Sequence, residues 1–254
     1  MTVLTLDRVS LAFGGIQALS DVSLTVPRGQ VTAVVGPNGA GKTSLFNVVC
    51  GFYRQTAGRI MFDGQEIGAM AAYRRASLGI ARSFQHMALI RGLSVLDNIK
   101  LGLHPRLKSN VLSAGLFLPG VRREEHALTA RIDREIIAFL GLESVRDHAV
   151  ETLPYGMQKR VELARVLAAE PSLLMLDEPA AGLNRGEKEE FGDLVLECIR
   201  RWPLSVILID HDMGMVMRIS DQVVVLNFGR VIAAGQAASV QANPDVIQAY
   251  LGVA

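Results

Sequence analysis

The stretch Gly36-Pro37-Asn38-Gly39-Ala40-Gly41-Lys42-Thr43 decides how this chain folds. The run Val31–Val35 precedes it, and its continuous apolar character predicts a buried strand. A helix is predicted to begin at Ser44 and to continue to about residue 50. A Gly-rich loop between strand and helix leaves unpaired backbone N–H groups at a helix N-terminus, where the helix dipole also favours an anion. The sequence therefore predicts an anion-binding loop made by residues 36–44.

The loop also fits the pattern G-x-x-x-x-G-K-[ST], which is typical of loops that bind nucleotide phosphates. In that interpretation Lys42 reaches the β- and γ-phosphates, and the hydroxyl of Thr43 ligates Mg²⁺. The alternative is a Gly-rich turn that binds nothing. The strand–loop–helix context makes a chance match rarer and favours the phosphate loop.

The composition limits the classes of partner. The chain has 254 residues, is 50% hydrophobic and 20% charged, and has a mean hydropathy of +0.28. Most of this apolar bias fits a large core with strands buried on both faces, and contact with membrane-embedded subunits is a further possibility. The net charge of +1 and the lack of a basic run argue against a nucleic-acid partner. Cys50 and Cys198 lie in apolar segments, which favours a reducing compartment and core packing.

The distribution of short apolar runs predicts an α/β fold. Strands are predicted in the first 62 residues and again after residue 170, with helix-like spacing between about 67 and 170. The later apolar runs are continuous rather than alternating, which indicates strands buried on both faces of a mostly parallel sheet. The result is a βα core with a helical insertion. The predicted strands are 3–6, 23–26, 31–35, 59–62, 173–177, 205–209 and 223–226, and the predicted helices include 96–101, 124–140, 156–169, 187–201 and 212–219.

Two of the predicted strands end in residues that suit phosphate chemistry. Asp177 at one strand tip would hold Mg²⁺, and Glu178 would polarise the water that attacks the γ-phosphate. His211 follows the next strand and would contact the γ-phosphate. A strand ending in Asp-Glu is common, and a lone histidine is usually structural. The functional interpretation is favoured because a phosphate loop lies upstream and ligands gather at strand ends of open α/β sheets.

Together these motifs resemble the nucleotide-binding subunit of an ABC transporter, over essentially the whole chain. The phosphate loop occupies the place of Walker A, and Asp177 and Glu178 that of Walker B with the catalytic glutamate. The segment around Gln85 resembles the Q-loop, and His211 the switch histidine. Residues 153–160 occupy the place of the signature motif, residues 181–184 resemble the D-loop, and Phe13 lies where the family stacks an aromatic ring on adenine.

The resemblance implies a single ATPase domain over residues 1–254. Its P-loop NTPase core, with an N-terminal antiparallel β subdomain, would span about 1–85 and 170–235, a helical signature subdomain about 86–169, and a C-terminal helical tail about 236–254. Catalysis would use Glu178, His211, Lys42 and Gln85, and Gln85 would also ligate Mg²⁺ beside Thr43 and Asp177. The implied ATP contacts further include Phe13, Asn184 and, toward the ATP of a second subunit, Pro154, Tyr155, Gly156 and Met157.

Within the family, residues 153–156, 178–184 and 243–252 resemble the Liv-type ATPase of branched-chain amino acid importers. That group implies a peripheral subunit on the cytoplasmic face of the cell membrane, paired with a second, identical or different, ATPase subunit and two permease subunits. A solute-binding protein would take part indirectly. Related importers of urea, amides or aromatic acids share much of the pattern, so other cargoes remain alternatives.

The signature segment departs from the family's usual Leu-Ser-Gly-Gly-Gln. Pro154 stands at the place of serine, Tyr155 at that of the first glycine, and Met157 at that of glutamine. Proline has no hydroxyl to offer a γ-phosphate, so backbone N–H groups near Gly156 would have to serve. The departure motivates a second hypothesis, a weakly hydrolysing regulatory ATP-binding subunit. A soluble ABC ATPase of DNA repair or translation, or a kinase, explains fewer of the motifs.

Overall fold

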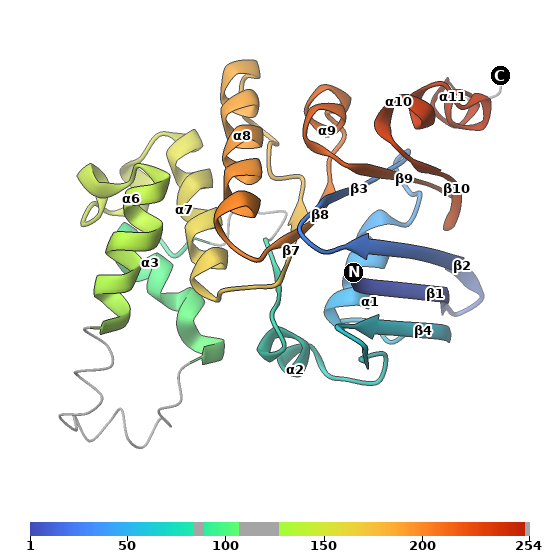
Figure 1. The fold of residues 1–254 in the computed structure, drawn as a ribbon, viewed down its shortest axis with the longest axis horizontal. Helices are drawn as coiled ribbons and strands as arrows, with labels where there is room; N and C mark the ends of the chain where they lie inside the picture. The colour runs from blue at the N-terminus through green and yellow to red at the C-terminus, as the bar shows by residue number, and fades with distance from the viewer. Residues whose placement is uncertain (84–88, 107–126, 252–254) are drawn as a thin grey trace. The chain divides into compact units, whose positions relative to one another are not determined.

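The computed structural model describes residues 1–83, 89–106 and 127–251 (Figure 1). The chain forms two compact units, divided near residues 85 and 171. The described part of the first unit comprises residues 1–83 and 172–251, and that of the second unit residues 89–106 and 127–171. Each unit is built from its own elements.

A six-stranded sheet forms the centre of the first unit, and its strand order is β10-β9-β3-β8-β7-β6. All neighbouring pairs are parallel except β9 and β10, which are antiparallel. Every residue of β3, β7 and β8 is buried, which explains their continuous apolar sequences. The strands are β3 (Val31–Val35), β6 (Ile80–Arg82), β7 (Leu173–Asp177), β8 (Ser205–Ile209), β9 (Gln222–Asn227) and β10 (Arg230–Gly235).

The prediction of helix-like structure from residue 67 onward is wrong at β6. This strand pairs in parallel with β7, so that Ile80 lies opposite Leu173. Helix α2 (Ala72–Ser77) precedes it. A three-residue strand at the edge of a sheet is too short to show a period of two, and its identity depends on the neighbouring strand rather than on its own sequence.

The second sheet of this unit is antiparallel, with the order β2-β1-β4-β5. Its strands are β1 (Thr2–Phe13), β2 (Ile16–Pro27), β4 (Ala57–Phe62) and β5 (Gln65–Glu66). Figure 1 shows β1 between β2 and β4. One hydrophobic core contains buried residues from both sheets and from helix α1 (Lys42–Cys50). Cys50 and Cys198 are both free thiols and buried, as predicted.

Four further helices complete the first unit: α8 (Arg185–Arg201), α9 (Met213–Ile219), α10 (Ala237–Gln241) and α11 (Pro244–Leu251). Helix α8 connects β7 to β8, and α9 connects β8 to β9. These helical crossovers allow the strands to run parallel. In the described residues, no helix combines the length and the apolar character that crossing a bilayer requires.

The second unit is helical. It contains α3 (Val95–Lys100), a 3₁₀ turn at Leu101–Arg106, a helix at 127–140 that includes a π-helical turn at Ile132–Ile137, and α7 (Tyr155–Ala168). Two short 3₁₀ turns, Glu143–Val145 and Val150–Thr152, lead into α7. The α/β fold class predicted from the sequence is confirmed, with the helical insertion between β6 and β7.

Candidate nucleotide-binding site

The phosphate loop connects the end of β3 to the start of α1, as the sequence predicts. Gly41 is the N-cap of α1 with a φ of 102°, and no side chain caps the helix. The first turn contains no acidic residue. The N–H groups of this turn are therefore left for a ligand, and the helix dipole makes that ligand an anion.

Glycine is required at the first position of the loop. Gly36 has a φ of 152°, and a Cβ placed there would lie 2.1 Å from the carbonyl oxygen of Leu226 on β9. Such a contact cannot be relieved by a side-chain movement, because the obstacle is backbone. The loop is thus packed directly on the neighbouring strand, which fixes its path before any ligand binds.

Lys42 has its ammonium group folded onto the loop. Its Nζ donates hydrogen bonds to the carbonyl oxygens of Gly36 at 2.7 Å and Pro37 at 3.0 Å. Burial lowers the pKa of Lys42, and the nearby carboxylates of Glu178 and Asp177 oppose that shift. The lysine is therefore held beside the loop by groups that a phosphate would replace.

A pocket of about 550 Å³ lies over the loop. It is lined by residues 38–44 of the loop, but not by Gly36 or Pro37, and by two predicted catalytic residues, Lys42 and Glu178. Its lining is completed by residues from the start of β2 and from the β9–β10 turn. The lining residues are Ile16, Gln17, Ala18, Asn38, Gly39, Ala40, Gly41, Lys42, Thr43, Ser44, Glu178, Ile209, Phe228 and Gly229.

Glu178 reaches the pocket through an unusual backbone conformation. Its φ of 48° is in the left-handed region, which a non-glycine residue occupies only when the surroundings enforce it. The N–H of Glu178 donates to the carbonyl oxygen of Ile209 at 2.7 Å, which ties the residue to the end of β8. The strained turn directs consecutive carboxylates, Asp177 and Glu178, to different surroundings.

Asp177 ends β7 and is only 2% exposed. Its Oδ2 accepts a hydrogen bond from Nη2 of Arg82 at 2.6 Å, and its N–H donates to Oγ of Ser83 at 3.2 Å. Asp177 and Thr43 offer carboxylate and hydroxyl oxygens, the hard donors that Mg²⁺ prefers. The described residues contain no cluster of three or more His, Cys, Asp or Glu side chains that would hold a metal unaided. This donor set fits Mg²⁺ bound together with phosphate oxygens and waters.

His211 follows β8, and its side chain is 70% exposed. Its Nδ1 lies 4.0 Å from Oδ1 of the buried Asp210. Asp210 also accepts a hydrogen bond from the N–H of Asp212, and Asp212 in turn caps α9 by accepting from the N–H of Met215. The histidine therefore projects from a loop whose backbone is fixed by the two aspartates on either side.

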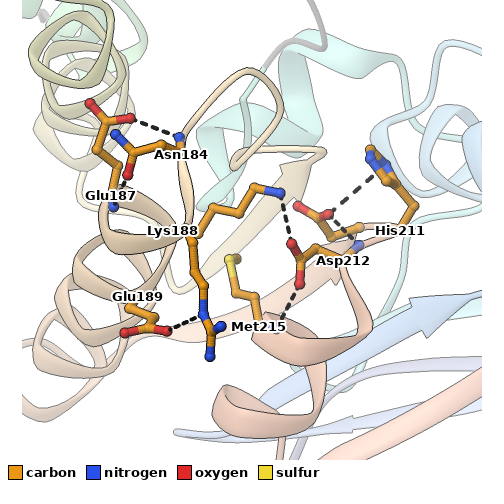
Figure 2. Close-up of polar contacts among 9 residues, drawn as sticks. Asn184, Glu187, Lys188, Glu189, His211, Asp212 and Met215 are labelled. Carbon is orange, nitrogen blue, oxygen red and sulfur yellow. Dashed lines mark hydrogen bonds and ion pairs between the residues drawn. The ribbon is translucent and has the colours of Figure 1, made fainter.

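The loop is further held by helix α8. Nζ of Lys188 donates to Oδ2 of Asp212 at 2.7 Å, as Figure 2 shows. This contact lowers the pKa of Asp212 and raises that of Lys188. Asn184 begins α8 and forms a capping box with Glu187, with bonds of 3.0 and 2.8 Å in the two directions. In this structure the side chain of Asn184 thus caps α8, the helix that holds the loop of His211 through Lys188.

The chain matches known families along most of its length. Residues 19–181 match the family model described as ABC transporter, and residues 230–254 match one described as branched-chain amino acid ATP-binding cassette transporter. The high-affinity branched-chain amino acid transport ATP-binding protein BraF of Pseudomonas aeruginosa is 40% identical, and its alignment covers 99% of this chain and 98% of that protein. LivG of Escherichia coli, with the same description, is 38% identical with the same coverage.

Among solved structures, the ADP conformation of an ATP-binding cassette of an ABC transporter superposes with a TM-score of 0.87. The two chains are 29% identical, and each is covered completely. The chain belongs to the ABC transporter family. It is an ATP-binding subunit of the ABC type, and it hydrolyses ATP to drive a membrane transport system.

Phe13, the residue predicted to stack on adenine in this ABC ATPase, is not among the described residues that line the pocket. Phe13 ends β1 and is 45% exposed. Its ring packs edge-on against the ring of Tyr53, with centroids 5.1 Å apart and an interplanar angle of 78°. Tyr53 was not among the predicted site residues, because its contact with Phe13 at the end of β1 joins segments that are distant in the chain.

The signature segment lies in the second unit, at the start of α7. Pro154 is the N-cap and supplies no side-chain hydrogen bond, and Tyr155 is 42% exposed. The first turn contains no acidic residue. Further along the helix, Lys159 pairs with Glu162 at 3.2 Å, and its Nζ lies 5.8 Å from the centre of the Tyr155 ring. Gln85, the predicted Q-loop residue, lies outside the described residues.

Six residues of the pocket lining were not predicted from the sequence: Ile16, Gln17, Ala18, Ile209, Phe228 and Gly229. Phe228 is 83% exposed with a φ of 44°. The pattern of β9 located the strand, but no local feature indicated that the turn after it folds beside the phosphate loop. The hydrogen bond from the N–H of Gly229 to the carbonyl of Ala40, at 2.9 Å, makes that connection.

Proposed function

We propose that this chain hydrolyses Mg²⁺·ATP in order to power the import of branched-chain amino acids. The observation that supports the chemistry is the shared pocket of Lys42, Thr43 and Glu178, with Asp177 buried beneath it. The cargo is supported by the match of residues 230–254, a segment that comprises β10, α10 and α11. The importers named in the relatives' descriptions carry the same cargo.

In this proposal each residue of the site has a separate role. The N–H groups of the loop and of the first turn of α1 bind the phosphates, while Lys42 exchanges its two loop carbonyls for phosphate oxygens. Thr43 and Asp177 hold Mg²⁺, which offsets phosphate charge when bound. Glu178 orients and polarises the attacking water, and His211 contacts the γ-phosphate from the loop after β8. Phe13 provides a ring for the adenine, and Tyr53 holds that ring in place.

The active assembly in this proposal contains a second ATPase subunit, two permease subunits and a solute-binding protein, with the ATPase peripheral on the cytoplasmic face of the membrane. The start of α7 of one subunit faces the γ-phosphate bound to the other. Its uncapped N-terminus, free of acidic residues in the first turn, suits that task. Backbone N–H groups near Gly156 then replace the hydroxyl that Pro154 lacks.

The test of the chemistry is Glu178→Gln, with Glu66→Gln on the exposed strand β5 as the matched control. We expect Glu178→Gln to bind ATP normally and to lose hydrolysis by at least about a hundredfold, because the water loses its base. Glu66→Gln should match the wild type both in ATP affinity and in the rate of hydrolysis. Normal turnover by Glu178→Gln in the assembled complex would refute the assignment of the base.

The cargo is tested by reconstituting the chain with its permease and solute-binding partners. Leucine, isoleucine or valine should stimulate ATP hydrolysis, whereas urea, short amides and aromatic acids should not. Stimulation by one of the latter compounds alone would assign this ATPase to a related importer.

A second candidate is a regulatory subunit that binds ATP and rarely cleaves it. The observation that favours it is Pro154 at the N-cap of α7, where no side chain can donate to a phosphate. Steady-state hydrolysis by the chain, alone and with a partner ATPase, separates the two candidates. A turnover rate that Glu178→Gln does not lower would favour the regulatory role.

A further inference from the structure

A buried ion pair lies beneath the proposed metal-binding side of the site. Arg82 ends β6 and Asp177 ends the adjacent strand β7. Nη2 of Arg82 donates to Oδ2 of Asp177 at 2.6 Å, and the two side chains are 12% and 2% exposed. Because both side chains are buried, water screens the ion pair little, and removing either charge would leave the other buried without a counter-charge.

Arg82 is also bound to helix α1. Its Nη1 donates to Oδ1 of Asn47 at 2.6 Å, and its guanidinium carbon lies 5.5 Å from the centre of the Phe46 ring. One side chain thus joins the end of β7 to the helix that begins at Lys42. Neither Arg82 nor Asn47 lines the nucleotide pocket, so neither is placed to contact ATP directly.

Asp177 therefore faces a bound cation before any metal arrives. One of its oxygens, Oδ2, is held by Arg82, and Lys42 contributes a second positive charge close enough for Asp177 to influence its pKa. A divalent cation that approaches Asp177 must share the carboxylate with Arg82. Two cations that compete for one carboxylate weaken each other's binding.

We propose that Arg82 is a place-holding cation for Mg²⁺ at Asp177. It neutralises and orients this buried carboxylate when no metal is bound, and it weakens its hold when Mg²⁺·ATP binds. Because the same guanidinium holds Asn47, the arrival of the metal is transmitted to α1 and to β6. The inference rests on the proposed role of Asp177 as a Mg²⁺ ligand. Arg82 acts through Asp177 and is a positioning residue.

The competition is measured by the factor by which Mg²⁺ increases the affinity of the protein for the ATP analogue. This factor is called the Mg²⁺ gain below. The dissociation constant of trinitrophenyl-ATP is determined in EDTA and in Mg²⁺ for the wild type, Arg82→Gln, Arg82→Lys and Arg28→Gln. Arg28 pairs with Asp63 at the surface and is the matched control. Removing the competing charge should increase the Mg²⁺ gain of Arg82→Gln by at least about fivefold. Arg82→Lys keeps the charge and should stay within about twofold of the wild type, as should Arg28→Gln.

Thermal unfolding gives a second readout that does not depend on activity. Without nucleotide, Arg82→Gln should unfold at a lower temperature than the wild type, because Asp177 is left buried without its partner. Saturating Mg²⁺·ATP should narrow that difference, since the metal replaces the missing charge. Arg82→Met, a second uncharged variant, is measured in parallel so that the test does not depend on the folding of one variant.

The outcomes are distinguishable. A Mg²⁺ gain that is unchanged or smaller in both uncharged variants would overturn the place-holding role while leaving ATP binding by the wild type intact. A wild type that fails to bind the nucleotide with or without Mg²⁺ would overturn the proposed function itself. A larger gain in both uncharged variants and a normal gain in Arg82→Lys support the inference.

Discussion

Arg75 gives the structure's strongest prediction about stability. It is the largest fully buried side chain of the described residues and is 2% exposed. Its guanidinium donates to four carbonyl oxygens: those of Val48 and Val49 at 2.7 and 2.9 Å, Met70 at 3.0 Å and Gly68 at 3.1 Å. Val48 and Val49 lie in the last turn of α1, where the helix dipole favours a cation. The carbonyl oxygen of Val48 also accepts a hydrogen bond from the N–H of Gly51 at 3.2 Å. Burial lowers the pKa of Arg75.

We expect Arg75→Met to lower the free energy of unfolding by about 3–5 kcal/mol. A hydrogen bond to a charged group contributes about 1.5–3 kcal/mol, and carbonyls left buried without a donor add a desolvation cost of about 1–3 kcal/mol each. The four bonds are not additive, because they share one guanidinium whose own burial is costly. For a chain of this size the loss corresponds to a melting temperature lower by roughly 6–20 °C.

The measurement is urea unfolding followed by the fluorescence of Trp202, the single tryptophan, which lies in the same unit as Arg75. Arg74→Met is the control: Arg74 is the exposed neighbour on the same helix, and its Nε donates to the hydroxyl of Tyr73 at 3.2 Å. That variant should change stability by less than about 0.5 kcal/mol. If the two variants unfold within 1 kcal/mol of each other, the carbonyl cluster is not the source of the stability.

Two further predictions concern the site and its support. Gly36→Ala should abolish nucleotide binding in a fluorescence titration, because its Cβ would meet the backbone of β9 at 2.1 Å; wild-type affinity would refute the fixed path of the loop. Lys188→Met should cost about 1 kcal/mol near neutral pH, a modest value because both side chains are about a quarter exposed. The folded pKa of Asp212 is depressed, so this contribution is present above the unfolded value near 3.8 and is lost as the pH falls through the folded value. The folded pKa of Lys188 is raised, so the contribution is also lost in strong alkali. Denaturant titrations from pH 3 to 8 should therefore give free energies of unfolding for the wild type and Lys188→Met that converge at the acid end. A difference that stays constant with pH would contradict the pairing of Lys188 with Asp212.

The phosphate loop was predictable because its chemistry is local. The strand, the glycines and the lysine are contiguous, and continuous apolar runs located β3, β7 and β8. The contacts that hold the site together are not local. Arg82 meets Asp177 across 95 residues, and Arg75 meets the end of α1 across more than 25. A sequence shows which side chains carry charge, but only the packing of β6 on β7 and of α2 on α1 shows which charges meet.

In the proposed assembly, the electrostatic balance of the pocket favours a contribution from a second ATPase subunit. Among the described residues that line the pocket, Lys42 is the only cation, and Glu178 opposes it. The guanidinium of Arg82 forms an ion pair with Asp177 and does not line the pocket. ATP with Mg²⁺ still carries net negative charge, which the α1 N-terminus offsets only in part. In that proposed assembly the α7 N-terminus of this chain, which lacks both a side-chain cap and an acidic first turn, would supply backbone donors to the ATP of the second subunit without adding negative charge. The departure at Pro154 is therefore compatible with hydrolysis, because the positive charge comes from the helix dipole and the backbone N–H groups and does not depend on the missing hydroxyl.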